Sequence, residues 1–482
     1  MAGIGFELRK IYRKEGITRN ALGAIYSSMV TIGPMVLVMC MLLLLYYILG
    51  MSHVSYADRE LLSSAILYNF IFSVLVTSPF NVTFSRYLAD KFFTEDFSDI
   101  MDSFYGGILC ISVIATLLAL PVAWSLYYRG GVSPAFIAAT YVQWMSLIFL
   151  FFSITYLHAT KDYKIIAAFY FAGLGIGTLL ASIFATFTNM GVILAIQSGT
   201  AIGFFIVAVM IFAYLKRYFS GDGHNFTQAL KYMWTCRKFL LANLFYVGGL
   251  YVHNFVFWFH PTRSIAGATY YTNQAYDMAT CIAMFTNIYL SVSFVVMVET
   301  RFHMAYKEYM ESILGGTHRV MDKTKLKMFR IMRQQMEQMF GTQVAITTVI
   351  FLVVITFGAE IGFDATTLAI YPVLAVAFLG VFMMYCNIVY LYYFADMTGA
   401  MLTSLIYFAA TLLGAMFSST LAVRFWGLGF LIGVLSGWTF SFFRLRWIER
   451  NIETYMFCDY KIINTMKSSA KGKVVYTKPK ED

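Results

Sequence analysis

Asp277 stands in the segment "NQAYDMATC", inside a long and otherwise uncharged apolar stretch. An ionisable side chain in a membrane-spanning segment is costly and marks a candidate functional site. A carboxylate at such a position can bind a cationic group or exchange a proton. It can equally be an interfacial residue that faces water, and the sequence leaves both interpretations open. The polar and aromatic residues at the same end of the stretch are Tyr270, Tyr271, Asn273 and Gln274.

His253 and Asn254 form a second polar pair in apolar surroundings, and His158 is a further isolated histidine. A buried histidine with a polar partner is the pattern of membrane acyltransferases, but a lone histidine in a span more often makes a structural hydrogen bond. The sequence has no P-loop, nucleophile elbow, H-E-x-x-H or paired-cysteine motif. We therefore expect no enzyme activity, metal or cofactor. The predicted substrate path comprises Asp277, Asn273, Gln274, Tyr270, Tyr271, His253 and Asn254.

The composition predicts the elements that must position these residues. Of the 482 residues, 60% are hydrophobic and only 12% are charged, about half the charged fraction of a soluble domain. The uncharged run 165–215 is long enough for two helices that cross a membrane. We expect an all-α polytopic membrane protein. Twelve spans are predicted, at 21–49, 61–85, 102–128, 134–158, 164–187, 191–215, 238–259, 272–299, 341–358, 366–394, 398–422 and 426–446.

The distribution of basic residues predicts the orientation of these spans. With both termini in the cytoplasm, 31 of the 35 Lys and Arg residues lie on the inner side. The exceptions are Arg59, Arg129, Arg263 and Arg424. This asymmetry is typical of a multi-pass protein of the cytoplasmic (inner) membrane. Orientation and attraction to anionic lipids explain the net charge of +10, so no nucleic-acid partner is implied.

The longest inner loops divide the chain into two halves of six spans each. Both halves enter from the cytoplasm, so they are predicted to be parallel repeats that face a central cleft. The expected organisation is a cytoplasmic basic amphipathic helix (1–19), an N-terminal bundle (20–219), a cytoplasmic linker (220–236), a C-terminal bundle (237–447) and a basic cytoplasmic tail (448–482). Helix breaks that suit alternating access are expected at Gly33, Pro34 and Pro79.

Two further patterns concern surfaces and packing. The segment 300–340 alternates basic and apolar residues and is predicted to form one or two amphipathic helices lying on the inner leaflet. A surface for a protein partner requires the same pattern and remains the alternative. Its basic residues include Arg319, Lys323, Lys325, Lys327, Arg330 and Arg333. In "GLGIG", Gly173 and Gly177 are four residues apart, which favours close helix packing rather than phosphate binding.

The opening "MAGIGFELRK" resembles the start of the PelG family, the membrane exporter subunit of the Pel exopolysaccharide system. Length, architecture, the basic loop 300–340 and the basic tail are also similar to that family, which belongs to the multidrug/oligosaccharidyl-lipid/polysaccharide exporter superfamily. The resemblance implies export of a growing, partly deacetylated amino-sugar polymer. It also implies a cytoplasmic glycosyltransferase and smaller membrane partners, one of which senses cyclic di-GMP.

Two other functions fit the sequence. One is a stand-alone cation-coupled flippase or antiporter for lipid-linked oligosaccharides or small molecules. The other is a non-conducting scaffold that recruits the synthase to the membrane. Retention of a glycosyltransferase by the gently solubilised chain would favour the synthase-coupled exporter over the stand-alone flippase.

Overall fold

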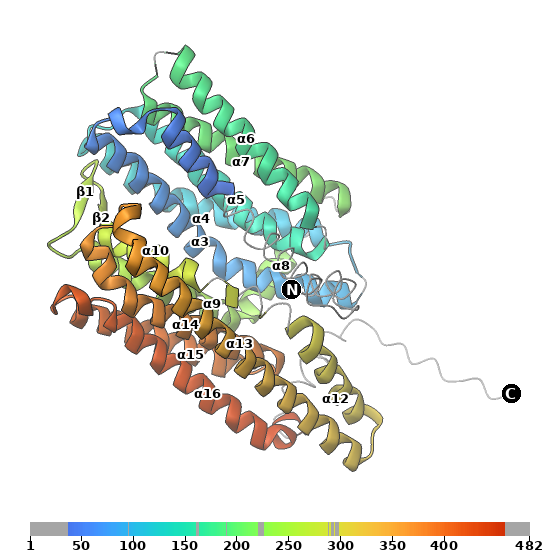
Figure 1. Ribbon diagram of the computed structural model, residues 1–482. Coiled ribbons are helices and arrows are strands. Elements are labelled where there is room, and N and C mark those ends of the chain that lie inside the picture. Colours follow the sequence, from blue (N-terminus) through green and yellow to red (C-terminus); the bar gives the residue numbers. More distant parts are fainter. Residues whose placement is uncertain are drawn as a thin grey trace, which may run out of the picture.

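The computed structural model describes residues 37–94, 96–160, 163–188, 190–219, 226–287, 289–290, 294 and 298–457. Within these residues the protein is almost entirely helical and has one two-stranded antiparallel sheet (Figure 1). The amphipathic segment 1–19, the expected break at Gly33 and Pro34, and the tail from 458 lie outside the described residues.

The first half of the chain consists of long helices with short connections. A short apolar helix, Leu37–Ile48, precedes the 3-10 turn η1. The elements of this half are η1 (Met51–His53), α3 (Tyr56–Phe93), α4 (Ile100–Tyr128), α5 (Pro134–Thr160), α6 (Tyr163–Phe187) and α7 (Val192–Tyr218). The short helix α8 (Phe226–Thr235) then leads into the second half.

The second half begins with α9 and is interrupted by a small hairpin. Its elements are α9 (Arg237–Trp258), β1 (Ser264–Ala266), β2 (Tyr270–Thr272), α10 (Gln274–Thr286), the π-helical turn η2 (Val298–Phe302), α12 (His303–Gly315), α13 (His318–Ile361), α14 (Ala365–Tyr393), α15 (Met397–Ser418), η3 (Val423–Phe425) and α16 (Leu428–Phe457). In the hairpin, Ile265 pairs with Tyr271.

Ten of the described helices are long and apolar enough to cross a membrane, and each coincides with one of the predicted spans. Helix Leu37–Ile48 covers the end of the first predicted span, and α10 covers the start of the eighth. The total of twelve spans stays a prediction, because parts of these two spans lie outside the described residues.

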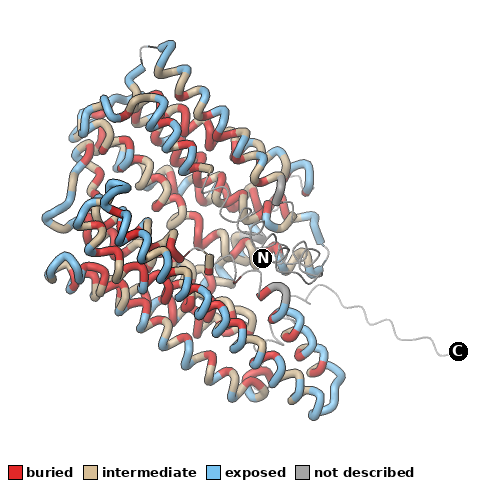
Figure 2. Tube along the Cα trace, viewed as in Figure 1, coloured by how far each residue is buried: buried red, intermediate tan, exposed pale blue. Residues whose placement is uncertain are grey.

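The two halves have separate hydrophobic cores. One core contains residues of α3 to α7 and the other contains residues from Phe257 onward, along α10 to α16. Buried residues lie inside each helix group, and exposed residues cover the outer faces (Figure 2). Ala266 and Tyr270 of the hairpin are exceptions, because they belong to the core of the first half. The hairpin is therefore a part of the second half that is buried in the first.

Pro79 does not interrupt its helix, in contrast to the predicted break. Helix α3 continues through Pro79 to Phe93. The hydroxyl of Ser78 donates to the carbonyl of Leu75 (3.4 Å), and that of Thr83 donates to the carbonyl of Pro79 (2.9 Å). Serine and threonine side chains that bond the backbone near a proline allow a helix to continue in an apolar environment.

The amphipathic segment 300–340 also differs from expectation, because it does not lie flat. It forms α12 and the first half of α13, which pack against each other as a hairpin. Helix α13 then runs through to Ile361 and includes the predicted span 341–358. No proline occurs between His318 and Ile361, so the helix continues along one axis. The basic half of α13 therefore projects beyond the apolar part of the bundle (Figure 1).

Candidate functional site

Asp277 lies in the first turn of α10, and its carboxylate accepts hydrogen bonds from three neighbouring residues. Oδ1 accepts from Nδ2 of Asn254 at 2.7 Å, and both oxygens accept from Nε1 of Trp258 at 3.0 and 2.9 Å. Oδ2 also accepts from the backbone N–H of Asn273 at 3.2 Å. An acid in the first turn is also favoured by the helix dipole. The carboxylate therefore joins α9 to α10 and fixes the orientation of the Trp258 indole.

The predicted path residues around Asp277 separate into two groups. Asn273 and Asn254 contact the carboxylate, whereas His253 points into the core of the second half. Nδ1 of His253 lies 2.9 Å from the hydroxyl of Tyr276, and its ring centroid lies 4.0 Å from that of Phe430. This arrangement places His253 in a packed, hydrogen-bonded environment away from Asp277.

The side chain of Tyr68 in α3 binds both backbone polar groups of Tyr271 in the hairpin. Its hydroxyl donates to the carbonyl of Tyr271 at 2.7 Å and accepts from the N–H of the same residue at 3.0 Å. Its ring stacks on Trp258, with centroids 4.6 Å apart and planes 15° apart. Asp277, Trp258 and Tyr68 thus form a continuous connection from α10 to α3, that is, from the second half to the first.

Additional contacts close the same end of the boundary between the halves. The hydroxyls of Ser125 in α4 and Thr269 in the hairpin are 2.9 Å apart. The hydroxyl of Tyr56 donates to Oε1 of Gln274 at 3.4 Å. Tyr270 is 1% exposed and packs beside Tyr68, with centroids 4.8 Å apart. We call Tyr68, Ser125, Trp258, Thr269, Tyr271 and Asp277 the hairpin junction.

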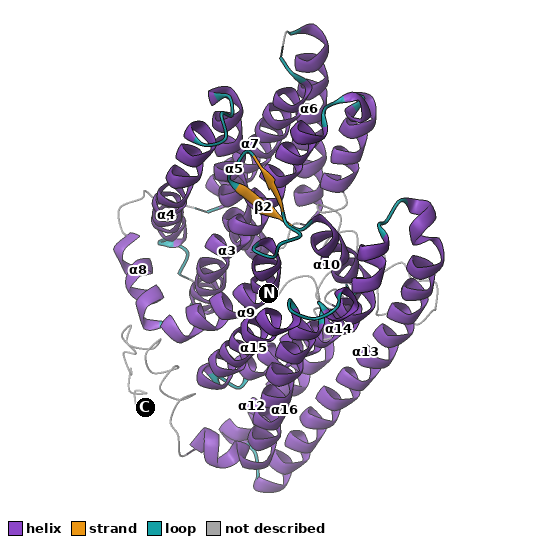
Figure 3. Ribbon diagram, turned by 90° about the vertical axis from the view of Figure 1, so that its left-hand side faces the viewer, coloured by secondary structure: helices purple, strands orange, loops and turns teal. Residues whose placement is uncertain are grey.

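The hairpin junction contains residues that the sequence did not single out. Of its members, Tyr271 and Asp277 were predicted, as were the nearby Tyr270, Asn273 and Gln274. The members that were not predicted are Tyr68, Ser125, Trp258 and Thr269. Figure 3 shows the hairpin from the side, with β2 lying over the helices of the first half. An aromatic residue in an apolar helix carries no local signal that it will contact a strand about 200 residues away.

At its opposite end, α3 contacts the helix α8, which connects the two halves. The hydroxyl of Tyr232 in α8 donates to Oδ2 of Asp90 in α3 at 2.6 Å. Burial, and secondarily the hydrogen bond to Asp90, raise the pKa of the Tyr232 phenol, which therefore remains a donor at neutral pH. Between the two ends, Nδ2 of Asn243 in α9 donates to the carbonyl of Ser78 at 2.6 Å. The halves are therefore joined by polar contacts at the hairpin end and at an intermediate level, and Tyr232 holds the connecting helix α8 on α3.

Each half also contains a buried polar cluster. In the first, Oε1 of Gln143 accepts from Nδ2 of Asn69 (2.7 Å) and from Nε2 of Gln197 (2.9 Å). In the second, Nε2 of Gln343 donates to Oδ1 of Asn287 at 3.2 Å. Such clusters add hydrogen bonds between apolar helices that otherwise associate only by packing. They were not predicted, because single amides in long apolar runs give no periodic signal.

The basic residues of α13 are held partly by acidic residues of neighbouring helices. Nζ of Lys325 lies 2.7 Å from Glu453, and a guanidinium nitrogen of Arg333 lies 2.9 Å from Glu449, both carboxylates belonging to α16. Lys327 pairs with Glu308 of α12 at 2.6 Å. Arg319, Lys323 and Arg330 are exposed on the same helix. These contacts fix the α12–α13 hairpin to the second half.

No group of three or more His, Cys, Asp or Glu side chains is placed to hold a metal ion within the described ranges. The described helices are apolar and form two groups, and polar contacts join these groups at the hairpin end and at mid-length. This arrangement is typical of a multi-pass membrane transporter.

Solved structures with a similar fold support that class. An outward-facing multidrug resistance MATE family transporter of the MOP superfamily superposes with a TM-score of 0.53 at 15% identity, covering 89% of this chain and 96% of that chain. An inward-facing structure of such a transporter gives 0.54 at 12% identity, covering 82% and 92%. A mutant of a Vibrio cholerae MATE transporter gives 0.57 at 12% identity, covering 90% and 98%. At these identities the likeness concerns the fold.

The family follows from the sequence profile that matches the chain. The profile of PelG, described as "Putative exopolysaccharide Exporter (EPS-E)", matches residues 1–457. The chain belongs to the PelG family, as its opening residues predicted. A comparison with curated proteins found no match.

Proposed function

We propose that this chain exports a growing amino-sugar exopolysaccharide across the cytoplasmic membrane. The main support for this proposal is the match to the PelG family over residues 1–457. The fold of the chain also resembles that of MATE transporters. Transport in this fold requires a boundary between the halves that can open. The hairpin junction supplies a closed end, since it joins α3 and α4 to the hairpin by hydrogen bonds and ring stacking.

The proposal includes an orientation. The end of the molecule that carries α8 and the α12–α13 hairpin faces the cytoplasm, because the basic residues concentrate there. The hairpin junction then lies at the outer face. The projecting basic α12–α13 hairpin offers a site for a cytoplasmic glycosyltransferase, and small membrane partners complete the synthase complex. No catalysis by this chain is required.

A cross-link across the hairpin junction tests transport directly. The hydroxyl oxygens of Ser125 and Thr269 are 2.9 Å apart, so sulfur atoms at these positions can form a disulfide with an S–S distance of about 2.05 Å. The Ser125→Cys, Thr269→Cys double variant should form this bond on the oxidising outer face. Polymer secretion in a strain without the native chain should stop and should return after mild reduction.

The matched controls are the two single cysteine variants, which should secrete polymer normally with or without reductant. Secretion that is unchanged while the disulfide is formed would show that the boundary need not open, and would favour a non-conducting scaffold. Co-purification addresses the partner separately. A gently solubilised chain that transports polymer but never retains a glycosyltransferase would support the stand-alone flippase.

A further inference from the structure

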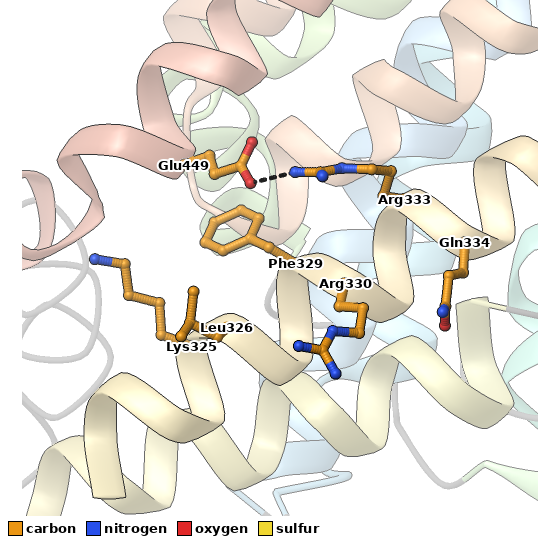
Figure 4. A pocket seen from close by; sticks show the side chains of 7 residues that line it. All are labelled: Lys325, Leu326, Phe329, Arg330, Arg333, Gln334 and Glu449. Carbon is orange, nitrogen blue, oxygen red and sulfur yellow. Dashed lines mark hydrogen bonds and ion pairs between the residues drawn. The ribbon is translucent and has the colours of Figure 1, made fainter. Parts of the chain in front are cut away.

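A pocket of about 490 Å³ lies between α13 and α16, away from the hairpin junction. Its lining combines cationic and apolar side chains, and Figure 4 shows Arg333 directed at Glu449 beside the ring of Phe329. The lining residues are Lys325, Leu326, Phe329, Arg330, Arg333, Gln334 and Glu449. The pocket therefore offers both positive charge and apolar surface to one ligand.

The position of the pocket along the helices places it at the edge of the apolar belt. On α16, Phe443 is 66% exposed and Trp447 is 42% exposed, and Glu449 lies two residues after Trp447. On α13, exposed apolar residues continue from Phe340 toward the outer end, and Arg333 precedes Phe340 by about 10 Å of helix. Aromatic and basic residues gather at this level where lipid headgroups meet the protein.

The charge of the pocket is not fully compensated by its own carboxylates. Glu449 is shared by Arg333 (2.9 Å) and Arg446 (3.0 Å), and Glu453 pairs with Lys325. In the described part of the chain, Arg330 has no ion-pair partner. Its exposed guanidinium is thus available to an anion, and a planar guanidinium binds phosphate oxygens in a bidentate manner.

We propose that this pocket binds the phosphate of an anionic phospholipid from the inner leaflet. Arg330 is the main contact with the phosphate, and Arg333 and Lys325 add positive potential. A water-soluble anion would gain nothing from Leu326, which is 64% exposed at the pocket. The lipid would tie the α12–α13 hairpin and α16 to the membrane surface. The proposal depends on the inner orientation given above but not on the identity of the polymer.

Lipid binding to the full-length protein tests this proposal. Purified protein in detergent is titrated with dioleoyl phosphatidylglycerol or dioleoyl phosphatidylcholine, and bound lipid is counted by native mass spectrometry. The wild type should retain phosphatidylglycerol in preference to phosphatidylcholine. Arg330→Gln should weaken phosphatidylglycerol binding about fivefold, as expected for the loss of one basic residue near an anionic headgroup.

Arg319→Gln is the matched control, because Arg319 is exposed on the same helix and does not line the pocket. It should bind phosphatidylglycerol like the wild type. Equal losses in both variants, or equal retention of the two lipids, would overturn the proposal. Displacement by millimolar inorganic phosphate would identify a site for a soluble anion instead. Capture of an acidic protein that phosphatidylglycerol does not displace would identify a partner surface.

Discussion

The hydroxyl of Tyr68 donates to the carbonyl of Tyr271 and accepts from its N–H, at 2.7 and 3.0 Å. One side chain of α3 thereby replaces part of the strand pairing that an edge strand lacks. Strand β2 pairs with β1 on one side and is held by Tyr68 on the other. The hairpin is therefore anchored to the half of the molecule to which it does not belong in sequence.

Removal of the Tyr68 hydroxyl should loosen the hairpin junction. Tyr68→Phe loses two hydrogen bonds, each worth about 0.5–1.5 kcal/mol, while the ring stack on Trp258 is retained. In intact cells carrying Thr269→Cys, a membrane-impermeant maleimide should label the thiol about 5- to 150-fold faster in the Tyr68→Phe background. Tyr127→Phe, at an exposed tyrosine of α4, should leave the rate unchanged. Equal rates in both backgrounds would show that the hydroxyl does not hold the junction closed.

Replacement of the Asp277 carboxylate should lower export without lowering the amount of protein in the membrane. In Asp277→Asn, only one oxygen remains to accept from Asn254, Trp258 and Asn273, and the new amide group meets these donors. Loss of a hydrogen bond to a charged group costs about 1.5–3 kcal/mol, so secretion should fall about tenfold or more.

The control for Asp277 is Asp364→Asn. Asp364 is an exposed N-cap of α14, and asparagine caps helices as well as aspartate does. Secreted polymer is measured together with membrane-protein level by immunoblot. Normal secretion by Asp277→Asn would remove Asp277 from the candidate site.

Asp90 and Tyr232 should contribute to stability as one interacting pair. Tyr232→Phe and Asp90→Ala should each lower the melting temperature of the purified protein, because the hydrogen bond of 2.6 Å is lost in both. Asp90 is partly exposed, so a cost of about 1 kcal/mol is expected. The melting temperature of the double variant should be no lower than that of the less stable single variant. Additive losses would contradict a direct interaction, and Tyr218→Phe, at an exposed tyrosine, serves as control.

The helices could be predicted because their signals are local. Long uncharged runs predicted the ten described membrane-spanning helices. The proximity of Asp277, Asn273 and Asn254 follows from α9 and α10, which are consecutive helices connected by the hairpin. The flat orientation predicted for 300–340 was wrong, because amphipathicity does not distinguish a helix on a membrane from one that packs on a neighbour. The continuation of α3 through Pro79 depends on side-chain hydrogen bonds that are visible only in the fold.

The hairpin junction could not be predicted for a different reason. Its strands have only three residues each, too few for an alternating pattern. Gly267 and Ala268 both have positive φ, 54° and 50°. The usual sequence signal for such a turn is glycine or asparagine, and alanine at the second position hides it. Tyr68 gives no signal at all, since its partner is 203 residues away.

The close helix packing predicted at Gly173 and Gly177 is confirmed, and the structure shows that the partner helix is α7. This contact can be tested by substitution. A Cβ atom at Gly177 would lie 2.7 Å from the carbonyl oxygen of Gly199 and 2.8 Å from Cα of Gly203. Backbone atoms cannot move aside as a flexible side chain can, so Gly177→Leu must separate the two helices. The loss in stability should exceed the value of about 1–3 kcal/mol that is typical of overpacking.

Gly175 of the same helix provides the matched control, since a Cβ there would meet no atom within 4 Å. Gly175→Leu should give normal amounts of monodisperse protein in fluorescence-detected size-exclusion chromatography, whereas Gly177→Leu should give aggregate or little protein. Both variants add the same apolar volume to the same lipid-compatible helix. A difference between them therefore reports the contact with α7, and equal profiles would mean that the α6–α7 contact is dispensable for folding.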